Sequence, residues 1–219
     1  MILDDITDFV EQRERRERVM DQLVSTILRV VGRQDPFTAE HAGRSAEVSE
    51  AISNAMGLDD DAIRTIATAA KLMNLGRASL PQELTTKPGK LEPEELATIR
   101  AAVRASAEML QSVEFDGNVA ETIRQVHERW DGEGEPRVLK GEAILESARV
   151  VAVADAFTGM ISARAHRPGL SLDKAEEIIA SLAGTSLDRK PVTALLFHLE
   201  NGGGREDWAD FAVSPTAAE

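Results

Sequence analysis

The segment ARVVAVADAF (Ala148–Phe157) is apolar around almost its whole circumference when its residues are placed on a helix. A helix without a polar face has to be buried on all sides. We therefore predict a long helix over residues 142–165 at the centre of the fold. Asp155 interrupts this apolar stretch, and an unpartnered carboxylate is costly to bury. Either a metal ion or a hydrogen-bonding partner must accompany it, and we expect a partner.

Helical periodicity dominates the rest of the chain, and no segment shows the alternation of a half-buried strand. These patterns predict an all-α bundle. We expect Thr38 to cap the second helix. Residues 76–93 contain Gly, Pro and Thr together with three leucines, which indicates an ordered loop. The other predicted helices cover residues 4–32, 39–56, 59–75, 93–112, 117–129, 172–183 and 189–200.

The first helix carries its own apolar stripe, in steps of three and four residues, which includes Met20, Leu23, Ile27 and Val30. The charged run EQRERRER interrupts the stripe, and we interpret that run as a solvated face. We expect this helix to project from the domain and to help form a homodimer, the alternative being that the stripe packs on its own domain. The predicted divisions are an N-terminal helix over residues 1–33, a domain over 34–200 and a mobile acidic tail over 201–219.

The composition indicates a globular protein, with 42% hydrophobic and 29% charged residues. The absence of cysteine excludes disulfides and thiolate metal sites. A net charge of -13 repels phosphate backbones and anionic lipid, which argues against nucleic-acid and membrane-surface binding. No apolar run approaches the roughly 20 residues that span a bilayer, and the opening MILDDITDF is acidic where a signal peptide is basic. We expect a cytoplasmic protein.

Eight short motifs, taken together, resemble the HD-GYP family of bacterial cyclic di-GMP phosphodiesterases, in the family's order and at its spacing over roughly residues 32–200. The resemblance implies an HD-domain helical bundle in which His and Asp side chains hold two or three metal ions. Those ions would activate a water that attacks a phosphodiester. The motifs are DPFTAEH (Asp35–His41), KLMNLGR, LPQELTTKPGKLEPEE, HERWDGEGEP (His127–Pro136), LKGEAI, ARVVAVADAF, SARAHRP and SLAGTSLD.

This sequence departs from the family at the positions that the resemblance assigns to metal ligands. The His-Asp doublet that names the superfamily aligns with Met73, which we interpret as core filler, and Asn74, whose neutral amide offers no charge. The Gly-Tyr-Pro triplet reads Gly-Glu-Pro at residues 134–136. Two further ligand positions fall on Ala102 and Val126.

The ligand-type residues that survive are His41, His127 and Asp155, which supply a single negative charge for several divalent ions. We therefore predict no bound metal, no cofactor and no catalytic residue. His41 is interpreted either as a relic ligand or as a capping histidine. The family places His127 and Asp155 at the same ions, so we expect these two side chains to contact each other directly or through one water.

The function predicted from this pattern is a catalytically inactive HD-GYP-like regulatory module that acts through contact with another signalling protein. A non-hydrolysing receptor for cyclic di-GMP or a related nucleotide is the first alternative. Such a receptor would grip phosphate with Arg164 and Arg167, which lie on one face of a helical segment. A metal-dependent phosphodiesterase with a reduced site is the second alternative.

Overall fold

The computed structural model describes residues 2–85, 87, 92–134, 139–163 and 168–212. Within these residues the chain is helical, and the β structure is limited to one isolated bridge between Ala183 and Leu187. The all-α prediction is therefore confirmed. The α-helices are α1 (Ile2–Gln34), α2 (Pro36–Ala55), α3 (Asp60–Leu72), α4 (Gln82–Thr85), α5 (Pro93–Leu110), α6 (Val119–Gln125), α7 (Glu146–Ile161), α8 (Leu172–Leu182), α9 (Arg189–Asn201) and α10 (Gly204–Asp207).

Helix α7 lies at the centre, in contact with α2, α3, α6, α8 and α9. Its residues Val150, Val151 and Val153 are fully buried, as the apolar sequence predicts. The helix is shorter than predicted at both ends. Gly141–Ala143 forms a separate 3-10 turn, η2, and Leu145 is extended before the first helical residue. At the other end the backbone becomes extended at Ser162.

Helix α2 begins one turn earlier than the sequence suggested. Asp35, not Thr38, is the N-cap, because its carboxylate accepts a 3.1 Å hydrogen bond from the Thr38 backbone amide. Pro36 occupies the first helical turn, where its missing N–H costs nothing. The earlier start places His41 in the second turn of the helix, on a segment that is already ordered.

The predicted loop after α3 contains regular structure, since η1 (Leu75–Ser79) and α4 lie within it. Backbones approach closely here: a Cβ on Gly76 would lie 2.1 Å from the Ala102 carbonyl oxygen of α5. The Gly76 amide donates a 2.8 Å hydrogen bond to the Ser106 hydroxyl. Glycine at position 76 therefore allows α5 to pack against η1.

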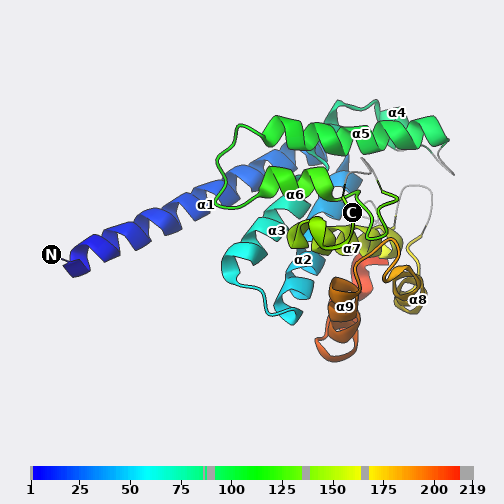
Figure 1. Ribbon diagram of the computed structural model, residues 1–219. Coiled ribbons are helices and arrows are strands. Elements are labelled where there is room, and N and C mark those ends of the chain that lie inside the picture. Colours follow the sequence, from blue (N-terminus) through cyan, green and yellow to red (C-terminus); the bar gives the residue numbers. More distant parts are fainter. Residues whose placement is uncertain (1, 86, 88–91, 135–138, 164–167, 213–219) are drawn as a thin grey trace.

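Helix α1 extends away from the bundle at its N-terminal end, and its C-terminal half packs on α2, α3 and η1 (Figure 1). Val24 and Val31 are buried, and Met20 and Ile27 are partly buried against the core, whereas Leu23 is 54% exposed. The predicted stripe is thus divided between an inward and an outward face. The charged run is more than a solvated face, because Arg16 pairs with Asp116 and Arg13 with Asp61.

The bundle does not end at residue 200. Trp208 is 2% exposed and Phe211 7%, so the first part of the predicted mobile tail is packed against the core. The Trp208 indole N–H donates a 2.8 Å hydrogen bond to Glu47 of α2. The Arg44 guanidinium lies 4.6 Å from the ring centre of Phe211 and donates to its backbone carbonyl. These aromatic anchors correct the predicted boundary.

None of the described helices is both long enough and apolar enough to cross a bilayer.

Candidate functional site

His41 and Asp155 meet where α2 crosses α7. The His41 Nε2 atom lies 2.7 Å from the Asp155 Oδ1 atom, a hydrogen bond in which the imidazole donates to the carboxylate. The Ser45 hydroxyl oxygen, one turn along α2, is 3.3 Å from the same nitrogen. The His41 side chain is 12% exposed and that of Asp155 is 30% exposed. The carboxylate in the apolar central helix is therefore satisfied from inside the bundle.

The sequence analysis named His127 as the partner of Asp155, and the structure describes a contact between Asp155 and His41. His127 follows the C-terminal end of α6, is half-buried and makes interactions of its own. A contact between His127 and Asp155 stays a prediction. His41 is 114 residues away from Asp155 in the chain, so only the crossing of α2 and α7 brings the two together.

The four positions assigned to lost ligands lie in the packed interior. Met73 ends α3 in the main core cluster with 1% of its surface exposed, and Asn74 is 5% exposed. Ala102 of α5 and Val126 at the end of α6 are 5% and 4% exposed. Three of these side chains have no atom that binds a hard cation, and the fourth is a neutral amide.

We tested whether the described residues fit the metal ions that the family resemblance implies. Among the residues that the structure describes, no three His, Asp or Glu side chains are grouped closely enough to hold a metal ion. His41 and Asp155 are two donor groups already joined to each other. Multi-ion sites need several anionic ligands to balance the charge. This set therefore does not fit a cluster of metal ions.

The HERWDG segment contains an ordered loop that is held by its own side chains. The Arg129 Nε atom donates a 3.0 Å hydrogen bond to Asp131, whose other oxygen pairs with the same guanidinium. This pairing, aided by the Glu133 backbone amide, lowers the pKa of the Asp131 carboxyl to about 2. Gly132 has a φ of 81°, which favours glycine. The carboxylate of this motif is thus engaged in holding its own loop.

The Trp130 ring anchors the same loop on the central helix. The Arg149 guanidinium of α7 lies 5.5 Å from the ring centre. Arg149 also pairs with Asp188, and both side chains are largely buried. The Trp130 amide donates to the Ser186 carbonyl oxygen. Arg164, Arg167 and Glu135 lie outside the described residues.

Comparison with known proteins identifies the family of this chain. The sequence pattern of the HD domain family matches residues 14–190. The chain belongs to the HD domain family. The resemblance to HD-GYP proteins drawn from the sequence is confirmed by the relatives and solved structures that follow.

Two curated relatives are named as cyclic dinucleotide phosphodiesterases. The cyclic di-GMP phosphodiesterase response regulator RpfG of Xanthomonas campestris pv. campestris is 33% identical over 189 residues, covering 85% of this chain and 48% of the relative. The 3'3'-cGAMP-specific phosphodiesterase 1 of Vibrio cholerae is 31% identical over 173 residues, covering 79% of this chain and 40% of the relative. The chain spans about half the length of such relatives.

Two solved structures share the fold. A cyclic GMP-AMP specific phosphodiesterase of V. cholerae, V-cGAP3, superimposes with a TM-score of 0.62 at 17% identity, covering 89% of this chain and 50% of the other. The HDG"Y"P protein Bd1817 of Bdellovibrio bacteriovorus also has a TM-score of 0.62, at 20% identity, covering 76% and 54%. At these identities the likeness shows the fold alone.

Proposed function

We propose that this chain is a non-catalytic regulatory module of the HD-GYP type that acts through contact with another signalling protein. The observation that carries the proposal is the hydrogen bond between His41 and Asp155. Two residues of the ligand type are joined to each other across the bundle, so each already has a hydrogen-bond partner within the protein.

The burial of the doublet positions supports the same conclusion. A polar side chain placed at Met73 would enter the main apolar cluster, where an unpartnered polar group costs about 1–3 kcal/mol. Asn74 can offer one carbonyl oxygen and no charge. Losing even a residue that only supports a metal ligand lowers affinity or activity about 10–100-fold. Replacement of several ligands together removes the hydrolytic chemistry.

Metal content and turnover test this proposal directly. The full chain is purified, incubated with Mn²⁺ or Fe²⁺, desalted and measured by elemental analysis, then assayed with cyclic di-GMP and 3'3'-cGAMP. We expect less than one transition metal per chain and no turnover above buffer. Two bound metals per chain, or hydrolysis that depends on the added metal, would contradict the proposal and favour the phosphodiesterase with a reduced site.

A nucleotide receptor is the second candidate, and the structure offers one observation in its favour. Thr158 lies on α7 and Ser162 is the C-cap of that helix, three and seven residues after Asp155, spacings that place them on the side of the helix that carries Asp155. Both hydroxyls are buried and have no hydrogen-bond partner among the described residues. Buried unsatisfied hydroxyls call for an explanation, and a bound nucleotide would supply partners.

Calorimetric titration separates the receptor from the protein-contact module. Sub-micromolar binding of cyclic di-GMP that is lost in Arg164→Ala would establish the receptor, with phosphate held by Arg164 and Arg167. No heat at high nucleotide concentration would leave the protein-contact function.

We further propose that one partner is a second copy of this chain, bound through the outward face of α1. Val19, Leu23 and Val30 are 47%, 54% and 61% exposed, and their spacings of four and seven residues place them on one side of the helix. Met20 and Ile27, which the sequence assigned to the same stripe, pack on their own bundle instead. The proposed dimer seam therefore consists of Leu23 and Val30 from the predicted stripe together with Val19, which the stripe did not include.

A further inference from the structure

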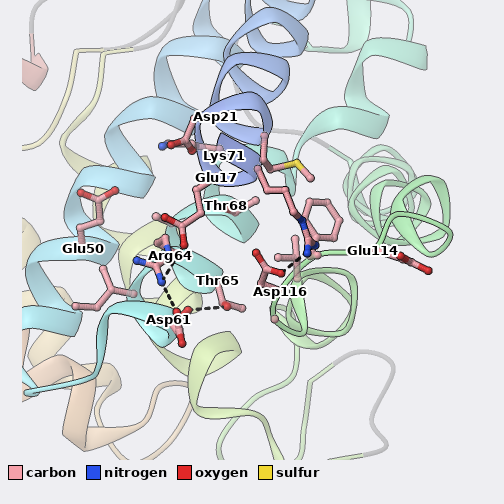
Figure 2. Close-up of a pocket in the computed structure, with 17 residues that line it drawn as sticks. Glu17, Asp21, Glu50, Asp61, Arg64, Thr65, Thr68, Lys71, Glu114 and Asp116 are labelled. Carbon is pink, nitrogen blue, oxygen red and sulfur yellow. Dashed lines mark hydrogen bonds and ion pairs between the residues drawn. The ribbon is translucent and has the colours of Figure 1, made fainter. Parts of the chain in front are cut away.

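A cleft of about 320 Å³ opens where α1 passes α2, α3 and the segment that leads into α6 (Figure 2). This volume is at the lower end of the range for small-molecule sites. The cleft is separate from the His41 and Asp155 site. Its α2 residue, Glu50, lies nine residues beyond His41, which is about 13 Å along the helix axis.

One part of the cleft wall is apolar. Met20 of α1 and Phe115 before α6 are partly buried there, and Ala67 of α3 and Val119 of α6 are buried. These side chains come from three separate helices or their ends. An apolar group of a ligand could pack on this wall, and an aromatic side chain such as Phe115 attracts a cation that reaches its ring face.

The charged side chains around this wall fall into two groups. Glu17, Asp61 and Asp116 are already paired with arginines, as the dashed lines in Figure 2 show in part. The side chains of Asp21 in α1, Glu50 in α2 and Lys71 in α3 have no hydrogen bond or ion pair within the described part of the chain. Glu50 and Lys71 are also partly buried. Glu114 also lines the cleft, and its side chain has no such contact among the described residues, so the side chains free to meet a ligand are three carboxylates and one ammonium.

The charge balance selects the ligand. Six acidic side chains line the cleft against three basic ones, and the chain as a whole carries a charge of -13. An anion at Lys71 would be repelled by the neighbouring carboxylates, whereas a cation would be attracted by them. We propose that the cleft binds a small organic cation, an ammonium or amidinium group carried on an apolar body.

Such a ligand would connect α1 to the bundle. Asp21 belongs to α1, and Glu50 and Lys71 belong to helices of the domain. Apart from apolar packing, α1 is held near the cleft by exposed ion pairs such as Arg16 with Asp116, each of which contributes little. A cation shared between Asp21 and Glu50 would add a link across this junction, so its concentration would control how firmly α1 is docked.

Phenethylammonium is a suitable probe, because it joins one ammonium to one aromatic ring. The full chain is titrated with it by calorimetry at low salt, beside phenylacetate, which has the same ring with the opposite charge, and methylammonium, which has no apolar body. We expect saturable one-to-one binding of phenethylammonium alone. The double variant Asp21→Asn, Glu50→Gln should weaken that binding roughly tenfold, since hydrogen bonds to charged groups carry this order of affinity.

Two variants give the control and a change in the opposite direction. Glu108→Gln removes an exposed carboxylate of α5 that is outside the cleft and should leave binding unchanged. Lys71→Met removes the ammonium and should tighten binding of the cation. Three results would each overturn the proposal. Phenylacetate could bind more tightly than phenethylammonium, or phenethylammonium could fail to saturate the protein at about 10 mM, about the weakest affinity that the assay resolves. The third such result is equal affinity of the double variant and the wild-type chain for phenethylammonium.

Discussion

Breaking the contact between His41 and Asp155 should lower the free energy of unfolding. A double-mutant cycle should show a measurable coupling energy between the two residues when no metal ion is present. The perturbation is a double-mutant cycle of His41→Ala and Asp155→Asn, which keeps the shape of the second side chain. The 2.7 Å separation of Nε2 and Oδ1 is that of a charge-assisted hydrogen bond. Such bonds contribute about 1.5–3 kcal/mol. The 30% exposure of Asp155 places this one at the lower end, so we expect a coupling of about 1.5 kcal/mol.

Urea unfolding in the presence of EDTA measures the cycle, with equal m-values required for all four proteins. Ser45→Ala is a matched control, because its hydroxyl lies 3.3 Å from the same nitrogen and makes only a weak contact. It should cost less than about 1 kcal/mol. A coupling below about 0.3 kcal/mol, which is within the additivity error of independent sites, would refute the direct contact. A coupling that appears only when Mn²⁺ replaces EDTA would show that a metal ion holds the two residues.

Three other predictions test the C-terminal anchor, the loop carboxylate and the outer face of α1. Trp208→Ala should lower the free energy of unfolding by about 3–5 kcal/mol. Phe197→Ala is the control, because that ring is 57% exposed, and it should change the free energy of unfolding by less than about 0.5 kcal/mol. Equal effects of the two variants in denaturant unfolding would show that Trp208 is not an anchor. The pKa of the Asp131 carboxyl is about 2 because Arg129 binds it. The contribution of this carboxylate to stability is therefore present above its unfolded pKa, near 3.8, and is lost as the pH falls through about 2. Arg129→Gln should return the midpoint of a carboxyl NMR titration toward 3.8, and an unchanged midpoint would exclude Arg129 as the cause. Leu23→Glu should convert the proposed dimer to a monomer by light scattering, and a wild-type chain that is monomeric with or without the residues before Asp21 would exclude the dimer.

Much of the architecture was predictable because periodicity is a local property. An apolar stretch such as ARVVAVADAF can be stable only when it is covered on all sides, so its central place followed from its residues. The segments that became α5, α8 and α9 were predicted with ends within a few residues, since caps and turn residues act on their own neighbours. The error at Thr38 had a local cause as well. Asp35, Pro36 and Thr38 are all compatible with a helix start, and the earlier residue was able to cap.

The candidate site was only partly predictable. That Asp155 needs a partner followed from the cost of burying a carboxylate, but the identity of that partner did not. His41 lies 114 residues from Asp155 in the chain, and the crossing of α2 and α7, which no local pattern specifies, brings the two side chains together. The sequence analysis chose His127 as the partner because the family resemblance places His127 and Asp155 at the same metal ions. The contact that the structure describes joins His41 to Asp155.

Composition and local pattern thus determined the class of the fold, the buried centre and the need to satisfy Asp155. Tertiary packing decided which residues share a face or a contact across large separations in sequence. Trp208 became a core residue because Glu47 and Phe157 form its surroundings, although its own neighbours are glycine-rich and acidic. The stripe of α1 was split in two because the bundle covers one side of that helix and leaves Leu23 and Val30 outside. Local sequence specifies what a segment can form, whereas burial depends on what the rest of the chain places beside it.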